Sequence, residues 1–507
     1  MRMMGLRALS GVVSALVILG VAELLAAGFG ADSSPVQALG SAIIDRTPTA
    51  VRESVIDIFG TNDKAFLYAC MTVVAIVLAA LAGILERQQR PIGSVLFAVF
   101  SVLAAVAALT RADATWTAAL PALVGAVAGI ASLRALVRRL DAPQQPAAAS
   151  VANRREFLGL AAGLCAAALL TGAAGRWIGS RVRDVSGNRA TVVLPAATDP
   201  APPIPPAADL RVPGLSSYVT ENSEFYRIDT AFTVPQLSTD EWSLRIHGMV
   251  DREVTLTYAD LTARPAVERA VTLTCVSNPI GGDLVGNATW LGYPIADLLA
   301  EAGPHPDADM VLSRSIDNFT AGSPLEVLTD GRDALLAIGM NGEPLPIEHG
   351  YPARLVVPGL YGYVSATKWV VELEVTRFDR VQAYWTERGW SERGPIKTAS
   401  RIDTPHSSAK LPAGQVAVAG VAWAQHRGIS AVEVQVDDGD WHPARLSEQY
   451  SGDTWRQWVY DWDATPGPHT VRARATDGTG AVQTAETADV IPDGATGLPA
   501  IFVHVQD

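Results

Sequence analysis

Five apolar segments in the first third of this 507-residue chain constrain its fold more than any other feature. Each approaches or reaches the roughly 20 apolar residues that a helix needs to cross a bilayer. They run approximately over 6–29, 65–85, 92–109, 116–137 and 157–178. A secretory signal peptide would account for one such segment but not for five. The sequence therefore predicts a membrane region of about five helices over residues 1–180.

Arginines around these segments predict the side of the membrane that each loop occupies, because Lys and Arg prefer the cytoplasmic side. They form three clusters, before the first segment, between the second and third, and between the fourth and fifth: Arg2, Arg7, Arg87, Arg90, Arg134, Arg138, Arg139, Arg154 and Arg155. The loop over 30–64 is instead acidic, with Asp32, Asp45, Asp57 and Asp63. With five spans, everything after Arg181 is then predicted to lie outside the cytoplasm, in a multi-pass protein of the cell membrane.

The fifth segment is preceded by Asn153-Arg154-Arg155-Glu156-Phe157-Leu158. Paired arginines followed by Phe-Leu and a Gly/Ala-rich apolar stretch are similar to a twin-arginine export signal. The alternative is an ordinary cytoplasmic flank of a membrane helix. Twin-arginine export would carry the following domain across the membrane already folded, which suits a protein that acquires a cofactor in the cytoplasm.

A proline-rich stretch, Pro195–Pro206, follows the membrane region and predicts an extended, semi-rigid linker over 181–209. Residues 210–400 are predicted to form an α+β domain, because short β-rich runs alternate with short helical patterns. The β-rich runs cover 242–246, 354–357 and 369–375, and a helical pattern covers 295–302.

Residues 413–507 have a different texture, in which strand-like runs are separated by Asp-Gly, Pro-Gly and Gly-rich turns. The runs cover 416–423, 429–436, 455–462 and 470–475. This spacing predicts a small antiparallel sandwich of immunoglobulin type. The predicted fold class is thus multi-domain, with a helical membrane region, an α+β domain and a C-terminal all-β sandwich.

Cys275 is the only cysteine beyond the apolar first third, and it lies where a β-rich run breaks into a Pro/Gly loop. Without a second cysteine in that region it has no partner for a disulfide there. A lone cysteine is either a small buried apolar residue or a reactive thiol. The other two cysteines, Cys70 and Cys165, lie inside apolar segments, where packing is their expected role.

Several motifs follow Cys275 in a fixed order. They are Asn278-Pro-Ile-Gly-Gly282, Trp290-Leu-Gly-Tyr-Pro294, Met340-Asn-Gly-Glu-Pro-Leu-Pro346, His349-Gly-Tyr-Pro-Ala-Arg354 and Gly362-Tyr-Val-Ser-Ala-Thr-Lys368-Trp369. In this order and spacing, the series resembles the sulfite oxidase family of molybdopterin enzymes. The resemblance extends from about Phe225 to the C-terminus and covers none of the first 180 residues. It implies a C-terminal immunoglobulin-like dimerisation domain, and hence a possible homodimer.

The resemblance also implies site residues. Cys275 matches the cysteine whose thiolate ligates molybdenum in the family, and a soft thiolate suits a metal already held by the sulfurs of the pterin dithiolene. Four residues match or adjoin the positions that bind the terminal phosphate of the cofactor: His349, Arg354, Ser365 and Lys368. Asn278, in the loop after Cys275, is assigned to the cofactor as well.

Arg227, in Phe225-Tyr-Arg-Ile-Asp229, matches an arginine that faces the substrate in sulfite oxidases, although Ile228 and Asp229 replace the Asn and His of that motif. Two further departures weaken the case for sulfite. No cation occurs over 276–280, and Arg388-Gly-Trp390 stands where an active-site tyrosine is expected, with Tyr384 the nearest alternative. A small dianion benefits from clustered positive charge.

The function predicted from the resemblance is a membrane-anchored, extracytoplasmic molybdenum-molybdopterin oxidoreductase that acts by oxygen-atom transfer on a small oxyanion or sulfur–oxygen compound, with sulfite as the leading substrate. No Cys-x-x-Cys-His, cytochrome b5 or dinucleotide motif is present, and all eight histidines come at or after His247, so no haem, flavin or NAD is predicted. A separate cytochrome or quinone-linked partner would then exchange the electrons, and no nucleic acid is expected as a partner.

Three alternatives remain open. A sulfoxide reductase of the methionine sulfoxide type could use the same fold. A membrane-tethered binding module could have lost its metal. A transporter is less consistent with the sequence, because Glu23 is the main ionisable residue within the spans and transport paths usually require more.

Overall fold

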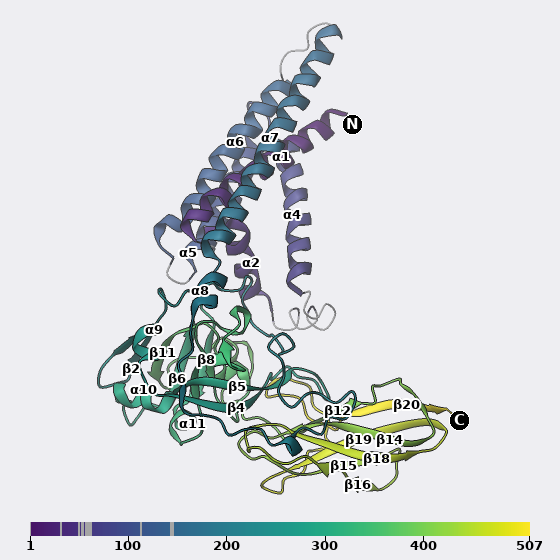
Figure 1. Ribbon diagram of the computed structural model, residues 1–507. Helices are drawn as coiled ribbons and strands as arrows, with labels where there is room; N and C mark the ends of the chain where they lie inside the picture. The colour runs from purple at the N-terminus through teal and green to yellow at the C-terminus, as the bar shows by residue number, and fades with distance from the viewer. Residues whose placement is uncertain are drawn as a thin grey trace. The chain divides into compact units, whose positions relative to one another are not determined.

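The computed structural model describes residues 2–30, 33–48, 51, 55, 63–111, 114–141 and 147–506 (Figure 1). The chain forms two compact units, the first from Met1–Asp184 with Thr230–Val234 and the second from Val185–Asp229 with Pro235–Asp507. Some residues used for the predicted topology lie outside the described part. They are Asp32 and Asp57, and the side chains of Arg2, Asp63, Asn153 and Arg154.

The first unit is helical. Its long helices are α1 (Arg2–Phe29), α4 (Asp63–Leu85), α5 (Ile92–Leu109), α6 (Leu120–Asp141) and α7 (Ala147–Arg183), and its shorter ones are α2 (Pro35–Arg46) and the 3-10 helix η3 (Trp116–Ala119). Among the described residues, five helices are long and apolar enough to cross a membrane, in agreement with the predicted segments. The stretch over 30–64 was predicted to be a loop, but part of it forms the helix α2.

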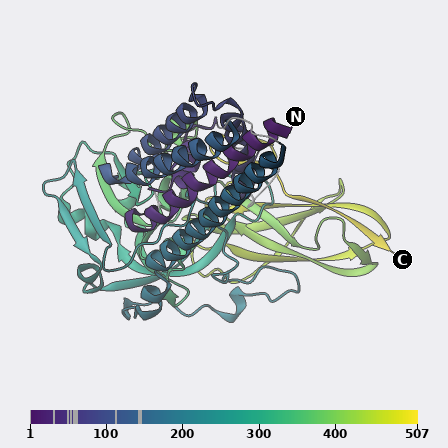
Figure 2. The same cartoon turned by 90° about the horizontal axis from the view of Figure 1, so that it is seen from above.

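Small residues allow the long helices to pack closely, and α1 lies against α4, α6 and α7 (Figure 2). A Cβ atom at Gly11 of α1 would collide with the main chain of Ala79 in α4, and one at Gly83 would collide with Arg7. Close approach of backbones through glycine is typical of helix packing in membranes. The segment Thr230–Val234 belongs to this unit because the ring of Phe232 stacks on Tyr68, with ring centroids 4.5 Å apart.

Charged residues gather at the two ends of this bundle. Arg7, at the start of α1, donates to the main-chain oxygen of Glu86 at 2.7 Å and forms an ion pair with Asp141 at the end of α6. Arg111, after α5, pairs with Asp45 of α2 at 2.9 Å. The start of α1 and the ends of α4 and α6, where predicted cytoplasmic arginines lie, therefore share one end of the bundle.

The second unit begins with a domain of two sheets and short helices, which agrees with the predicted α+β class. The first sheet has the order β1-β4-β5-β8-β10, with β9 paired to β8; its strands are β1 (Ala197–Asp199), β4 (Ala266–Thr274), β5 (Val285–Pro294), β8 (Leu335–Met340), β9 (Glu343–Pro344) and β10 (Arg354–Val356). The second has the order β3-β2-β11-β6-β7; its strands are β2 (Ser243–Gly248), β3 (Val254–Thr257), β6 (Met310–Ser315), β7 (Thr320–Pro324) and β11 (Val370–Thr376).

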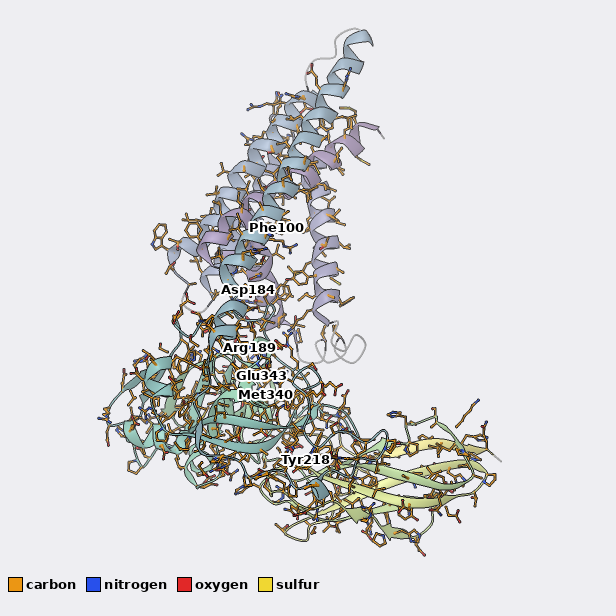
Figure 3. The ribbon with its side chains drawn as sticks, viewed as in Figure 1. Phe100, Asp184, Arg189, Tyr218, Met340 and Glu343 are labelled. Atoms are coloured by element: carbon orange, nitrogen blue, oxygen red, sulfur yellow. The ribbon has the colours of Figure 1, made fainter. Side chains whose placement is uncertain are left out.

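Short helices connect these strands: α8 (Ser186–Thr191), α9 (Tyr258–Thr262), α10 (Ile295–Ala302), α11 (Leu325–Thr329) and α12 (Gly362–Ser365). The α10 helix has the predicted bounds, because its apolar residues recur at helical spacing and Ile295, Leu298, Leu299 and Ala302 are buried. It ends at Gly303, whose φ of 70° favours glycine. Near α8, Arg189 donates to Glu343 at 3.0 Å, and Figure 3 labels both residues.

The proline-rich segment is not a free tether. Its strand β1 pairs in parallel with β4, and the hydroxyl of Thr198 donates to the main-chain oxygen of Ala266 at 2.9 Å. The 3-10 helix η4 (Pro206–Ala208) follows, and Ala208 is fully buried. The segment was predicted to be a spacer, but three residues between Pro195 and Pro200 pair with β4 and complete the edge of the sheet.

The C-terminal part of the second unit consists mostly of strands, in two sheets that share one apolar core. The first sheet contains β12 (Ala399–Thr404), β14 (Gly414–Trp423), β17 (Arg445–Leu446) and β18 (Arg456–Ala464). The second contains β13 (Lys410–Pro412), β15 (Ile429–Val436), β16 (Trp441–Pro443), β19 (Gly467–Asp477) and β20 (Ala500–Gln506). Four of these strands coincide closely with the four predicted runs.

Strand β4, which leads to Cys275, is hydrogen-bonded to this C-terminal part. Gln425 donates to the main-chain oxygen of Thr272 at 2.9 Å and to the hydroxyl of Thr274 at 3.0 Å. The main chain of Trp455 donates to the Thr272 hydroxyl at 2.7 Å. The hydroxyl of Tyr218, labelled in Figure 3, donates to Thr454 at 2.8 Å. These buried contacts fix the position of the strand that carries Cys275.

Candidate active site

Cys275 lies at the end of β4, in a loop that returns to β5. Its main-chain nitrogen donates to Leu284 at 2.9 Å, and its main-chain oxygen accepts from Asn278 at 3.1 Å. The thiol is free and buried, with 9% of the residue exposed. Burial raises the pKa of the Cys275 thiol, and hydrogen bonds from Ser277 oppose that rise.

Asn278 closes this loop. Its side-chain oxygen accepts from the main-chain nitrogen of Leu284 at 2.9 Å. A Cβ atom at Gly282 would lie 2.5 Å from that oxygen and 2.6 Å from Pro279, so only glycine fits there. Asn278 therefore shapes the loop that presents Cys275, and the Pro/Gly content of the motif follows from this tight turn.

Arg354, on β10, is a buried cation. Its guanidinium donates to the main-chain oxygens of His349 at 3.1 Å, Leu355 at 3.3 Å and Ala366 at 3.5 Å, and lies 5.1 Å from the centre of the Trp290 ring. Burial lowers the pKa of Arg354 to about 10. No carboxylate of the described residues forms an ion pair with it. Because burying an unpaired charge is costly, this position calls for an anionic ligand.

His349 lies beside Arg354 and is 3% exposed. Its Nε2 atom is 3.1 Å from the main-chain oxygen of Asn222, and its ring meets that of Phe225 edge to face. Burial, followed by the charge of Arg354, lowers the pKa of His349 to about 4. The imidazole is thus neutral at pH 7, with one ring nitrogen placed to donate to the Asn222 oxygen.

Lys368 completes the basic cluster but already has a carboxylate partner. Its Nζ atom lies 2.9 Å from Asp229 and donates to the main-chain oxygen of Glu348 at 3.1 Å. Burial lowers the pKa of Lys368 to about 8, while Asp229 opposes the shift. Arg227 donates to the same Asp229 carboxylate at 2.8 Å and remains 39% exposed at its side chain. The structure therefore groups Arg227 with Lys368, through the residue that replaces the histidine of the family motif.

Backbone geometry holds the cluster together. Gly350 has a φ of 111°, and a Cβ atom there would lie 3.0 Å from the Cβ atoms of both Arg354 and Lys368. Trp369 adopts a φ of 50°, which is unusual for a bulky residue, and its indole donates to Ile347 at 2.8 Å. The His-Gly and Lys-Trp pairs of the sequence thus bring the two cations next to each other.

Ser365, in α12, is fully buried and donates to the main-chain oxygens of Leu360 at 3.3 Å and Tyr361 at 3.0 Å. Its hydroxyl oxygen keeps acceptor capacity, but its proton is used within the helix turn. The main chain of the neighbouring Ala366 is one of the carbonyls that Arg354 contacts. Ser365 therefore belongs to the wall of the cluster.

Tyr226 is a site residue that the sequence analysis did not single out. Its side chain is close enough to interact electrostatically with both Cys275 and Arg354, and burial raises its pKa strongly. It is therefore a candidate site residue that senses both the thiol and the basic cluster. Trp290, whose ring faces Arg354, was likewise quoted only as part of a motif. The sequence signal for Tyr226 was its place next to Arg227. The signal for Trp290 was its place in a motif that follows Cys275.

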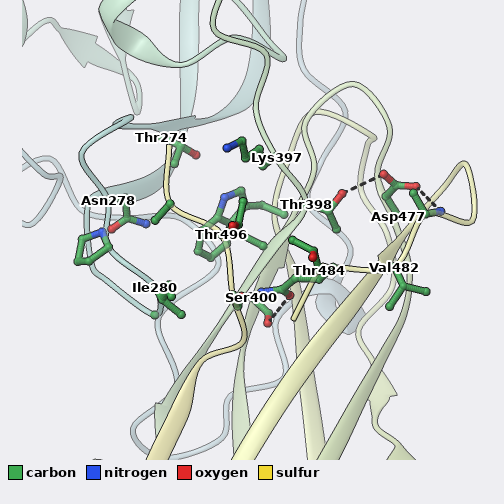
Figure 4. A pocket seen from close by; sticks show the side chains of 18 of the residues that line it. Thr274, Asn278, Ile280, Lys397, Thr398, Ser400, Asp477, Val482, Thr484 and Thr496 are labelled. Carbon is green, nitrogen blue, oxygen red and sulfur yellow. Dashed lines mark hydrogen bonds between the residues drawn. The ribbon is translucent and has the colours of Figure 1, made fainter. Parts of the chain in front are cut away.

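A cavity of about 330 Å³ adjoins the Cys275 loop (Figure 4). Thr274 and Asn278, which precede and follow Cys275, line it, but Cys275 itself does not. Tyr361, which interacts electrostatically with Cys275, also lines it. The opposite wall comes from the C-terminal part and includes Lys397, Arg427 and Asp477. Arg227 and the basic cluster do not line it.

These residues fit the cofactor that the sequence resemblance implies. The buried Arg354 lacks an anionic partner among the described residues, and Lys368 and His349 stand beside it, as a phosphate group would require. Cys275 supplies a buried thiol, and Tyr226 interacts electrostatically with both this thiol and Arg354. In the described part of the chain, no group of three or more His, Cys, Asp and Glu side chains is arranged to hold a metal ion alone.

Comparisons with known proteins identify the family of this domain. Residues 231–385 match the family described as "Oxidoreductase molybdopterin binding domain". An oxidoreductase of Bacillus subtilis is 32% identical over 154 residues, which cover 30% of this chain and 74% of that protein. Mitochondrial sulfite oxidase of Drosophila melanogaster is 27% identical over 321 residues, covering 54% of this chain and 55% of the relative. The chain thus spans about half the length of the sulfite oxidases that it matches.

Among solved structures, the sulfane dehydrogenase SoxCD from Paracoccus pantotrophus has a similar fold. The TM-score is 0.50 at 24% identity, and the match covers 57% of this chain and 81% of that one. The likeness therefore extends beyond the region that matches the domain family. Together with the bacterial relative, of which this chain covers nearly three quarters, these matches show that the chain belongs to the sulfite oxidase family of molybdopterin oxidoreductases.

Proposed function

We propose that this chain is a membrane-anchored molybdenum-molybdopterin oxidoreductase of the sulfite dehydrogenase type. The observation that carries the proposal is the buried guanidinium of Arg354, which has main-chain and aromatic partners but no carboxylate among the described residues. Tyr226 interacts electrostatically with both this cation and the buried thiol of Cys275. A cofactor that carries both a phosphate and a sulfur-bound metal would satisfy the two groups together.

When bound, the cofactor would supply two-electron oxygen-atom transfer at molybdenum. Cys275 would bind the metal as a thiolate, since coordination deprotonates a thiol whose pKa is otherwise raised by burial. Arg354 would present its planar donors to the phosphate, with Lys368 as a point charge and His349 as a neutral donor or acceptor. Asn278 would hold the Cys275 loop, and Ser365 would form the wall behind the phosphate.

The substrate is proposed to be a small oxyanion or sulfur–oxygen compound, because the relatives named above are sulfite oxidases and a sulfane dehydrogenase. Sulfite is the leading candidate from the sequence. A sulfoxide reductase on the same fold is the second candidate. Arg227 is proposed to act near the cofactor and not in the cavity, because it does not line the cavity and its side chain is bound to Asp229, the partner of Lys368.

The helical unit is proposed to anchor the enzyme with five spans and to leave the second unit outside the cytoplasm, after twin-arginine export. The clustering of Arg7 with the ends of α4 and α6 supports the orientation.

The C-terminal sandwich is proposed to be immunoglobulin-like and to form a homodimer. A cytochrome or quinone-linked protein would exchange the electrons. The proposed domain limits are 1–180, 181–209, 210–400 and 413–507.

Metal analysis of the purified full-length protein tests the proposal. We expect about one molybdenum and one pterin per chain, and turnover of a sulfur compound with an artificial electron carrier. Cys275→Ser should keep the membrane-bound fold and some pterin but lose turnover, because the thiolate is the only proposed metal ligand. Wild-type turnover in that variant, or a wild-type protein free of molybdenum and pterin, would favour the non-catalytic binding module.

A further inference from the structure

The cavity beside Cys275 is polar but electrically balanced. Two cations line it, and each is bound to a carboxylate. Lys397 donates to Asp493 at 2.8 Å and to the main-chain oxygen of Gly494 at 2.7 Å. Arg427 donates to Asp477 at 2.9 Å and to the main-chain oxygen of Ile396 at 2.9 Å. The described lining thus offers no cation without a carboxylate partner.

The two ion pairs differ in the burial of the carboxylate and in the number of hydrogen bonds that it accepts. Asp477 is 2% exposed and accepts from Thr398, Thr479 and Ala481 as well as from Arg427. This network holds Arg427 in place. Asp493 is about half exposed, and its side chain pairs with Lys397. Asp493 is therefore the one carboxylate whose loss would free a cation in the cavity without dismantling its wall.

The remaining lining is made of neutral groups. Hydroxyls and amides predominate, from Thr274, Asn278, Thr398, Ser400, Gln483 and Thr496, with aromatic and apolar surface from Tyr361, Trp423 and Val482. Such a surface can bind a dipolar, uncharged molecule by hydrogen bonds. A divalent anion would have to compete with the carboxylates of Asp493 and Asp477 for the cations, and it would meet their like charge.

We propose that Asp493 sets the charge specificity of this cavity: by pairing with Lys397 it selects an uncharged polar substrate, such as a sulfoxide, against a divalent anion such as sulfite. This inference rests on the proposed function, because it takes the cavity beside Cys275 as the substrate site. It runs against the leading substrate that the sequence suggested. It also agrees with the lack of any cation over 276–280 in the loop itself.

Equilibrium binding of sulfate, a divalent anion that does not react, tests the inference on the full-length protein. Wild-type protein should bind sulfate weakly, whereas Asp493→Asn should bind it about tenfold more tightly, because one charge-assisted contact is worth about that factor. Asp489→Asn removes an exposed carboxylate a few residues away and should leave the wild-type affinity unchanged. Dimethyl sulfoxide should bind Asp493→Asn and wild type equally, within about twofold.

A double variant distinguishes a freed cation from a general loss of negative charge. Asp493→Asn with Lys397→Gln should lose the gain in sulfate affinity, and Lys397→Gln alone should bind sulfate as weakly as wild type. Tight sulfate binding by wild type that is lost in Lys397→Gln would overturn the inference, as would no gain in Asp493→Asn. Molybdenum is measured in the same samples. A metal-loaded protein with either of these results refutes the inference alone, whereas absent molybdenum refutes the proposed function.

Discussion

The guanidinium of Arg354 lies 5.1 Å from the centre of the Trp290 ring, and Trp290 itself is fully buried. The aromatic face and three main-chain oxygens stabilise the cation without neutralising it. Since the indole nitrogen of Trp290 is bound to the main chain of Val271 at 3.1 Å, the ring is fixed in place. The site is therefore organised around a buried positive charge before any ligand binds.

Arg354→Gln should lower cofactor occupancy. A hydrogen bond to a charged group contributes about 1.5–3 kcal/mol, so losing the contact between Arg354 and the phosphate should weaken cofactor binding about 10- to 100-fold. Molybdenum and pterin content per chain measures this effect. Arg245→Gln is the matched control, since Arg245 is half exposed in the same domain and pairs with Glu253. Equal occupancy in Arg354→Gln and wild type would contradict the assignment.

His349 should make the cofactor-free protein less stable in acid. Its folded pKa of about 4 lies below the ordinary value of 6.5, so the unfolded chain binds a proton first as the pH falls. The contribution of the neutral, buried His349 to the free energy of unfolding is complete above pH 6.5. It is lost as the pH falls from 6.5 to 4. Between pH 7 and pH 5 it should lower the free energy of unfolding by about 2 kcal/mol.

Chemical unfolding of wild type and His349→Gln at the two pH values measures this contribution. Glutamine keeps a polar side chain but does not titrate, so its free energy of unfolding should fall by about 2 kcal/mol less than that of wild type. Parallel losses in the two proteins would show that other groups carry the acid sensitivity.

The sequence predicted much of the architecture because local pattern decides it. The α10 helix follows from buried residues at helical spacing, and β15 begins and ends where its apolar run does. The motif around Cys275 also forms the expected loop. Contacts between residues far apart in the sequence could not be predicted in the same way. Lys368 and Asp229 are 139 residues apart, and the sequence alone could not show that the carboxylate replacing a histidine would bind this lysine.

The cavity was beyond sequence reasoning for the same reason. Its lining combines the Cys275 loop with residues from five further regions, near 361, 397, 425, 480 and 496. Only folding brings Lys397 to Asp493, which is 96 residues away. The partial strand in the proline-rich segment was missed because prolines dominate its composition, whereas pairing of β1 depends on the edge that β4 offers.

Asp229→Asn should make the site more sensitive to alkaline pH. Asp229 supports the charged form of Lys368, whose pKa is about 8, so removing the carboxylate lowers this pKa further. The pH above which cofactor is lost should then fall by about one unit, which corresponds to about 1.4 kcal/mol. Cofactor retention across pH 6–9 measures the shift.

Glu348→Gln serves as the control for that variant. The Glu348 side chain is exposed, and its contact with Lys368 is made by the main-chain oxygen, which the substitution keeps. Its alkaline limit should match wild type. A similar shift in both variants would indicate a general effect of negative charge, and no shift in Asp229→Asn would show that Lys368 does not need its partner.

The arrangement of charges in the helical unit makes a prediction about topology. Arg7 binds the main chain of Glu86 and the side chain of Asp141, so the starts and ends of α1, α4 and α6 that carry arginines share one end of the bundle. Since Arg and Lys prefer the cytoplasmic side, a reporter that is active only outside the cytoplasm should be silent when fused near Ala142 and active when fused after Asp507.

Replacing Arg154 and Arg155 by lysine should leave the first four spans inserted but retain the second unit inside. If the second unit still reaches the outside when twin-arginine transport is disabled, the export route is wrong, while the orientation from Arg7 and Asp141 remains testable by the fusion near Ala142.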